Sequence, residues 1–276
     1  MTRLLAITLF AVAYLGSGAT LCGQSQIEPL SLGGTFTLES AVLGEMRRVN
    51  VYAPPGYAQS DTARLPLLVM LDGGLGEDFL HVAGLVQIGA LNGTMRPHLL
   101  VGIENTERRR DLTGPTTDPR DSAMAPRVGG SAAFRRFLAE ELLPAVAARY
   151  RTTGERAIVG ESLAGLFVVE TLLLAPELFD TYIAVDPSLW WDGYRLNREA
   201  AGLLTAAGAR GRTLFLAGSG QPQLGAAAHR LYADLDAARL PGLTLRYRAF
   251  PDESHATVYH PAALAAFRAV LAPELR

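Results

Sequence analysis

Short apolar runs recur along most of this chain, and their spacing limits how it can fold more than any other feature. They are rich in β-branched residues and are bounded by Gly, Pro or Asp, as β-strands are. The first runs follow one another directly, whereas the later ones alternate with helical patterns. This order predicts an α/β domain whose sheet is mostly parallel, begins antiparallel and carries helices on both faces. The eight expected strands are Thr35–Ser40, Arg48–Ala53, Pro66–Leu71, Leu99–Ile103, Ala157–Val159, Tyr182–Val185, Thr213–Ala217 and Thr244–Phe250.

Helical periodicity separates the later strands. Apolar residues three and four positions apart predict an amphipathic helix over Ser131–Tyr150. Helices are also expected over Ala164–Leu174 and Ala262–Leu271. In a sheet of this kind, ligands bind at the carboxyl ends of the strands, so the residues that follow each strand are the candidates for chemistry.

Composition removes several classes of function. The chain has 276 residues and a net charge of −2, which gives no electrostatic reason to expect a nucleic-acid partner. All 25 basic residues are Arg, so lysine Schiff bases, the phosphate-loop lysine and Ser-x-x-Lys hydrolases are excluded. Because only one Cys and five His are present, we expect no metal ion and no cofactor. The remaining chemistry uses Ser, His, carboxylates and backbone amides.

The N-terminus has the pattern of an export signal. Arg3 precedes an apolar run over 4–15, and small residues follow at 16–19. This run is too short to span a membrane, which needs about 20 apolar residues. We predict a signal peptide over 1–23, followed by a single domain over 24–276, and hence a periplasmic or secreted protein. A lipid anchor at Cys22 is disfavoured by the large Leu21 before it.

A candidate nucleophile lies in the segment Gly160-Glu161-Ser162-Leu163-Ala164-Gly165. It follows an expected strand and precedes an expected helix. A nucleophilic serine needs a sharp strand-to-helix turn, and small residues two positions on either side allow that turn. The pattern alone is common in a chain rich in Gly and Ala, but its position between strand and helix predicts that Ser162 is the nucleophile.

The candidate base is His255, which follows the last expected strand. An imidazole with a pKa near neutrality can take the proton of a serine hydroxyl, and the order Ser then His is typical of hydrolases on this kind of sheet. His260 is the alternative, five residues further on. The remaining histidines fall on helix or strand segments away from this end and are expected to be structural.

Backbone amides that stabilise an oxyanion are expected at two places. One is the amide of Leu163, directly after the candidate nucleophile. The other is in the segment Leu71-Asp72-Gly73-Gly74, at the end of the third strand, where Gly74 or Gly73 supplies the N–H.

The acid that orients the histidine is not settled by the sequence. Its usual place follows the seventh strand, but that segment, Gly218–Gln223, holds no carboxylate. Asp186 ends the preceding strand and could reach the same imidazole. Glu253 lies two residues before His255. The third possibility is a Ser–His dyad whose imidazole is held by Gln221 or by a backbone carbonyl.

Taken together, these segments resemble the esterase D and enterochelin-esterase-like branch of the α/β-hydrolases, from about Gly34 to the C-terminus. That branch also contains mycolyltransferases and some feruloyl esterases. The resemblance implies an α/β-hydrolase fold and ester hydrolysis through an acyl-serine on Ser162, with His255 as the base and an oxyanion loop after Asp72. The missing acid after the seventh strand departs from the family pattern. The resemblance rests on Val51–Tyr57, Leu71–Gly74, Asn105–Arg108 with Asp111–Thr113, Gly160–Phe167, Pro187–Trp191 and Glu253–His255.

We therefore expect an exported serine esterase whose partner is a small-molecule ester, such as a siderophore, an acylated sugar or a small acyl ester. Trp190 and Trp191 follow the sixth strand and are candidates for lining the substrate pocket. Two different functions remain compatible with the sequence. One is an acyltransferase that uses the same nucleophile, and the other is a non-catalytic binding protein on a hydrolase scaffold. The sequence does not predict an oligomeric state.

Overall fold

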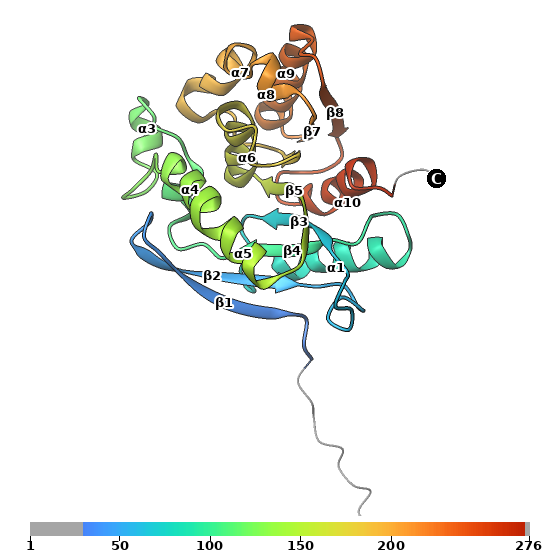
Figure 1. Cartoon of the computed structure of the whole chain (residues 1–276). Coiled ribbons are helices and arrows are strands. Elements are labelled where there is room, and N and C mark those ends of the chain that lie inside the picture. The colour runs from blue at the N-terminus through green and yellow to red at the C-terminus, as the bar shows by residue number, and fades with distance from the viewer. Residues whose placement is uncertain (1–29, 274–276) are drawn as a thin grey trace, which may run out of the picture. The chain divides into compact units, whose positions relative to one another are not determined.

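The eight expected strands form one sheet in the order β1-β2-β4-β3-β5-β6-β7-β8 (Figure 1). The structure is a computed structural model, and it describes residues 30–273. Most strand ends lie within a few residues of their predicted positions, and the largest difference is at β5, which begins five residues earlier. The strands are β1 (Gly34–Ser40), β2 (Glu45–Tyr52), β3 (Leu65–Met70), β4 (Leu99–Ile103), β5 (Thr152–Glu161), β6 (Thr181–Val185), β7 (Arg212–Ser219) and β8 (Leu243–Phe250).

Strand direction divides the sheet into two parts. β1 pairs with β2, and β2 with β4, in antiparallel fashion. All other neighbours, from β4 across to β8, are parallel. Parallel neighbours need crossover connections, and these are supplied by the helices between the later strands. The carboxyl ends of β3 to β8 therefore meet at one edge, and this edge holds the site described below.

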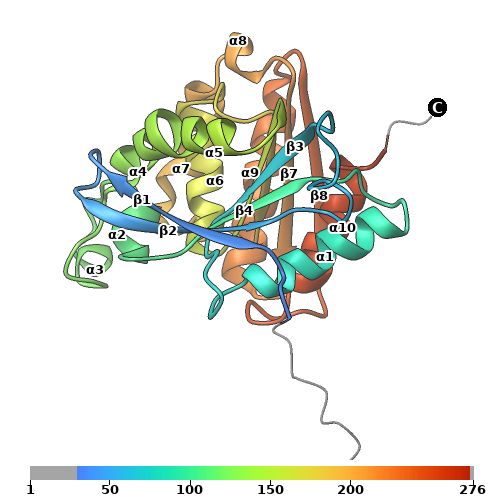
Figure 2. The same ribbon diagram turned by 60° about the horizontal axis from the view of Figure 1, so that its bottom comes forward.

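Helices cover both faces of the sheet, as predicted. One apolar core joins the sheet to α4, α5, α6, α7 and α9, and a second core joins the opposite face to α1 and α10 (Figure 2). The helices are α1 (Phe79–Leu91), α2 (Arg108–Leu112), α3 (Pro119–Ser122), α4 (Ser131–Phe137), α5 (Leu143–Arg149), α6 (Leu163–Leu174), α7 (Trp191–Leu203), α8 (Ala206–Ala209), α9 (Pro222–Ala238) and α10 (Tyr259–Val270).

The predicted helix over Ser131–Tyr150 is not uniform. It consists of α4, a π-helical turn over Leu138–Leu142 and α5, in direct succession. Pro144 explains the change of period, because a proline lacks the N–H that would continue the α-helical pattern. The other two predicted helices correspond to α6 and α10, and α10 begins three residues earlier than expected.

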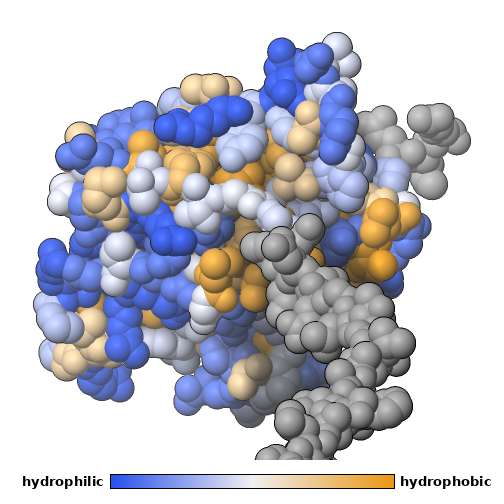
Figure 3. Space-filling model, turned by 90° about the horizontal axis from the view of Figure 1, so that it is seen from below, coloured by the Kyte–Doolittle hydropathy of each residue, from blue (hydrophilic) through white to orange (hydrophobic). Residues whose placement is uncertain are grey.

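The predicted signal peptide, with Cys22, lies outside the described residues. Within the described part of the chain, no helix is long and apolar enough to cross a membrane. Figure 3 shows one face of the folded domain, on which hydrophobic patches lie among hydrophilic side chains. Residues 32–273 form one compact unit.

Candidate active site

Ser162 lies at the turn between β5 and α6, with its backbone at φ 63° and ψ −122°. A non-glycine residue adopts positive φ only at a cost, and a side chain held there is exposed at the top of the sheet. The turn also requires Gly160, because a Cβ at that position would lie 2.6 Å from the backbone of Ala164. The predicted strand-to-helix turn therefore has the expected geometry.

His255 is brought to Ser162 by the loop between β8 and α10. Its Nε2 lies 3.0 Å from Ser162 Oγ, which is hydrogen-bonding distance. Its Nδ1 lies 2.7 Å from Asp186 Oδ2. His260 instead lies on α10, where its ring centroid is 5.0 Å from that of His81. The Ser–His–Asp arrangement is that of a serine hydrolase, in which the acid fixes the tautomer of the base.

Asp186 follows β6, one strand before the usual place of the acid, and its side chain is fully buried. Its backbone has a positive φ, of 42°. The end of β7 supplies support instead of an acid. The N–H of Ser219 donates to Asp186 Oδ1 at 2.8 Å, and the Ser219 hydroxyl donates to Oδ2 at the same distance. Ser219 was not singled out from the sequence, since it carries no charge.

Neither Glu253 nor Gln221 is brought to His255 as its orienting group. Within residues 30–273, the hydrogen bonds of Glu253 are made by its backbone, which accepts from Gly220 N–H and donates to Phe250 O. Gln221 precedes α9, and its backbone N–H donates to Ser219 Oγ; the hydrogen bonds of the imidazole go to Asp186 and Ser162 instead. Asp186 is thus the carboxylate in direct hydrogen-bond contact with the base.

A second carboxylate, to which the sequence pattern assigns no role, also faces the imidazole. Glu161 precedes Ser162, and its Oε1 lies 3.3 Å from His255 Nδ1. Burial raises the pKa of Glu161 to about 7, against smaller opposing effects of His255 and Arg108. Its position as the variable residue of the Gly-x-Ser-x motif gave no signal, because its side chain could equally have pointed to solvent.

The imidazole has a raised affinity for a proton. The hydrogen bond to Asp186 raises the pKa of His255 above its ordinary value, and the charge of Glu161 adds to this effect. Burial and the Arg108 guanidinium act in the opposite direction. A base of this kind is neutral, and able to accept the serine proton, only when the pH exceeds the raised pKa.

The three backbone amides predicted to stabilise an oxyanion differ in whether their N–H groups are already engaged. Leu163 N–H is at the first position of α6 and so has no acceptor within the helix. Gly73 N–H is already donated to Ile103 O at 2.8 Å, so its prediction as an oxyanion donor is wrong. Gly73 is glycine for another reason: a Cβ there would lie 2.3 Å from Gly102 Cα, in a close approach of two backbones.

Gly74 N–H is the remaining donor of this loop. It donates to Glu77 Oε2 at 2.6 Å, so a substrate oxyanion must replace that carboxylate as acceptor. The loop is anchored from behind by Asp72, which lies at φ 53°. Both oxygens of Asp72 accept from the guanidinium of Arg108, at 2.6 and 2.7 Å. The side chain of Asn105 also donates to Asp72, at 2.6 Å.

The two tryptophans have separate environments. Trp190 lines a cavity of about 440 Å³ together with residues of α3 and α7 that include Arg120 and Tyr194. Trp191 does not line it. Its side chain is buried in the core and donates its indole N–H to Gly114 O at 2.9 Å, so the prediction that it contacts substrate is wrong. Aromatic size alone did not distinguish the two positions.

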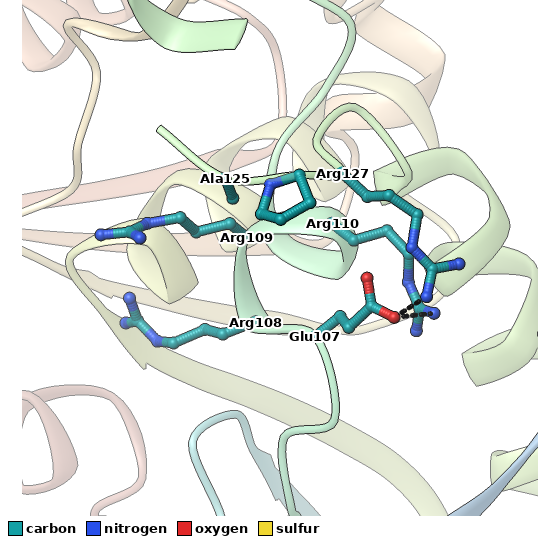
Figure 4. Close-up of a pocket in the computed structure, with 7 residues that line it drawn as sticks. Glu107, Arg108, Arg109, Arg110, Ala125 and Arg127 are labelled. Atoms are coloured by element: carbon teal, nitrogen blue, oxygen red, sulfur yellow. Dashed lines mark hydrogen bonds and ion pairs between the residues drawn. The ribbon is translucent and has the colours of Figure 1, made fainter. Parts of the chain in front are cut away.

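A larger cavity, of about 570 Å³, is lined by arginines of the α2 segment and its surroundings (Figure 4). Arg110 and Arg127 converge on Glu107, whereas Arg108 and Arg109 extend to the other side of the pocket (Figure 4). Arg109 donates to the carbonyl of Met124 and, among the described residues, forms no ion pair. The pocket therefore has a surplus of positive charge.

No cluster of His, Cys and acidic side chains suited to a metal ion occurs in residues 30–273.

Comparisons with known proteins identify the family of this chain. Residues 40–256 match a family model described as "Putative esterase". The chain is 30% identical over 204 residues to the ferri-bacillibactin esterase BesA of Bacillus subtilis, an alignment that covers 64% of this chain and 68% of that one. It is 31% identical over 190 residues to a siderophore triacetylfusarinine C esterase of Aspergillus fumigatus, with coverage of 62% and 61%.

Solved structures give the same result for the fold. An IroE-like serine hydrolase from Shewanella oneidensis superposes with a TM-score of 0.76 at 27% identity, over 87% of this chain and 80% of that one. The BES protein from Bacillus cereus superposes with a TM-score of 0.75 at 20% identity, over 89% and 98% of the two chains. The expected α/β-hydrolase fold is therefore confirmed.

Proposed function

Since the chain belongs to the esterase family whose model it matches over 40–256, and is a carboxylic ester hydrolase, we propose that it acts through an acyl-serine formed on Ser162. The observation that carries this proposal is the continuous set of contacts from Ser162 Oγ through the imidazole of His255 to Asp186. A serine hydroxyl is a weak nucleophile until a base takes its proton, and this arrangement supplies that base.

We propose the following steps for acylation. His255 Nε2 takes the proton as Ser162 Oγ attacks the ester carbonyl, and Asp186 stabilises the imidazolium that results. The carbonyl oxygen becomes an oxyanion that accepts from the amides of Leu163 and Gly74, once it replaces Glu77 at the latter. The imidazolium then protonates the leaving alkoxide, the alcohol departs, and the acyl group stays on Ser162.

Deacylation repeats these steps with water. His255 takes a proton from a water molecule, whose oxygen attacks the acyl-serine. The second tetrahedral intermediate collapses, Ser162 recovers its proton from the imidazolium, and a carboxylic acid is released. Each step uses only residues of this chain and a water molecule.

For the substrate we propose a siderophore ester. Two relatives carry names that describe siderophore esters as their substrates, ferri-bacillibactin and triacetylfusarinine C. The arginine-lined pocket favours an anionic substrate. One of its arginines, Arg108, also lies near enough to His255 for its charge to lower the pKa of the imidazole. Export through the segment 1–23, proposed from its sequence pattern, would place the enzyme outside the cytoplasm.

The nucleophile is tested first. The purified protein and Ser162→Ala are assayed on p-nitrophenyl esters from acetate to octanoate, and both are treated with a fluorophosphonate. We expect hydrolysis and labelling by the native chain, and a loss of turnover of at least about 10⁴-fold in the variant. Turnover retained by Ser162→Ala would contradict the proposed mechanism.

The substrate and the reaction type are tested separately. Ferri-bacillibactin is incubated with the enzyme with and without an added alcohol, and the products are identified by mass spectrometry. Free acid in both mixtures supports hydrolysis, whereas a new ester of the added alcohol indicates an acyltransferase. If the enzyme hydrolyses simple esters but leaves the siderophore intact, only the proposed substrate is contradicted.

The proposed export is tested by the mass of the protein after secretion, which reports whether the signal peptide has been removed.

A further inference from the structure

Glu161 is a charged side chain beside the nucleophile to which the reaction described above gives no role. It is the last residue of β5, and only 17% of its side chain is exposed. Its Oε1 lies 3.3 Å from His255 Nδ1, the same nitrogen that contacts Asp186 at 2.7 Å. Two carboxylates thus face one imidazole N–H.

The neighbouring cation does not neutralise Glu161. The guanidinium of Arg108 donates through Nε and Nη2 to both oxygens of Asp72, so its charge is already paired. In the part of the chain that the structure describes, the ion-pair contact of Glu161 is the one with His255. The imidazolium formed during the reaction is therefore the cation that this carboxylate can stabilise.

We propose that Glu161 is a positioning residue that, when ionised, acts as a second counter-ion for the imidazolium of His255 and so accelerates both proton transfers at Ser162. This inference rests on the proposed acyl-serine mechanism. Glu161 gives and takes no proton in the reaction. The proton moves from Ser162 Oγ to His255 Nε2 and then to the leaving alkoxide, and Glu161 acts through the charge of the imidazole alone.

The charges around Glu161 make its ionisation sensitive to that of the base. Asp186 and Asp72 oppose its ionisation, and burial opposes it most, whereas His255 and Arg108 favour it. These effects together raise the pKa of Glu161 to about 7. The hydroxyl of Tyr259 on α10 is buried near the same charges, and burial raises its pKa, so it stays neutral throughout this range.

The two titrations must be coupled. Because His255 and Glu161 attract one another when both are charged, each favours the charged form of the other. At low pH Glu161 is protonated, and a neutral carboxyl resembles an amide in size and charge. Above about pH 8 it is ionised and stabilises the imidazolium. The contribution of Glu161 to the rate therefore grows with pH, unlike that of a residue that only supports the fold.

The kinetic test uses Glu161→Gln, with Glu253→Gln as a matched control on the loop that carries His255. The quantity measured is kcat/KM for p-nitrophenyl acetate from about pH 5 to pH 9. We expect the native enzyme and Glu161→Gln to coincide below about pH 6. Above about pH 8 the variant should be about tenfold slower, which corresponds to one unit of coupling between the two groups. Glu253→Gln should follow the native profile throughout.

Two results would overturn the inference. One is a Glu161→Gln profile equal to the native one at every pH. The other is a decrease by the same factor at every pH, which is the behaviour of a merely structural residue. Glu161→Asp, which restores the charge on a shorter side chain, should recover part of the rate at high pH.

A measurement without substrate separates this inference from the proposed function. The pKa of His255 is followed by NMR in the native chain and in Glu161→Gln, with the resonance assigned by its absence in His255→Gln. A lower pKa in Glu161→Gln is expected, and an unchanged one would refute the coupling even if the protein hydrolyses esters. If no ester is hydrolysed, the titration still decides whether the coupling exists.

Discussion

Two clusters of charged side chains in this domain differ in their balance of charge. The first is the arginine cluster, which consists of Arg47, Arg110, Glu45 and Asp111 beside β2 and α2. Arg47 and Arg110 each donate to Asp111 at 2.6 Å, and Arg110 also donates to Glu45 at 2.7 Å. Two cations meet two carboxylates, and Arg47 is almost entirely buried.

At the active site the balance is different. Two carboxylates, of Glu161 and Asp186, face the single imidazole of His255. The effects on ionisation are opposite as well. Hydrogen bonds from Arg110 lower the pKa of Glu45 to about 2, whereas burial raises the pKa of Glu161 to about 7. Arg110 therefore keeps Glu45 ionised at neutral pH, whereas burial leaves Glu161 able to titrate near neutral pH.

The largest expected effect is on catalysis. Asp186→Asn removes the charge that stabilises the imidazolium, and it should lower kcat for ester hydrolysis by about 10⁴-fold, as the equivalent change does in a serine protease. The measurement is kcat on a p-nitrophenyl ester above the pKa of His255. Retention of more than about a tenth of the native kcat would remove Asp186 from the proposed triad.

The next effect is on stability. Arg47→Met keeps an apolar side chain against Phe134, whose ring lies 5.2 Å from the guanidinium, but leaves buried Asp111 with one cation fewer. Breaking a buried ion pair costs about 3–5 kcal/mol, so the free energy of unfolding should fall by that amount. Urea denaturation measures it. A loss of kcat as large as that of Asp186→Asn would show that the two clusters are not independent.

The smallest effect is a difference in the pH dependence of stability. A carboxyl whose pKa is raised in the folded state weakens the fold as the pH rises from about 4.5 to about 7. Glu161→Gln removes this loss and should stabilise the domain at pH 8 by about 1–3 kcal/mol.

Glu45, whose pKa is lowered, stabilises the fold above about pH 4.5, and this contribution is lost as the pH falls toward 2. Glu45→Gln should therefore destabilise the domain at about pH 8, and denaturation at about pH 5 and pH 8 compares the two variants.

The strands were predictable because each is a short apolar run with clear boundaries, and the parallel order places their carboxyl ends at one edge. Ser162 and His255 follow strands in the expected order, and so their proximity could be predicted from the sequence. Whether Asp186 or Glu253 reaches the imidazole depends on the direction of a loop backbone, and the sequence carries no signal for the positive φ of Asp186. The supporting hydroxyl of Ser219 was missed because an uncharged serine at the end of a strand gives no signal of such a role.

Errors at Gly73 and Trp191 have a common physical origin. In both cases the residue type fits a role in the site, but its N–H group already donates to a backbone carbonyl. The amide of Gly73 donates to Ile103 O, and the indole of Trp191 donates to Gly114 O. Commitments of this kind depend on tertiary contacts between distant segments. Glu161 shows the reverse case, in which tertiary contacts give a role to a position that the motif leaves open.

The backbone of Ser162 has a consequence for experiments on bound substrate. At φ 63° a glycine would meet no steric opposition, whereas a serine does. Ser162→Gly therefore removes the hydroxyl and relaxes the turn at the same time, while Ser162→Ala keeps the strained Cβ. An inactive chain that folds more readily than the native one can hold an uncleaved ester in place, which makes this substitution the suitable choice for capturing the enzyme with its intact substrate.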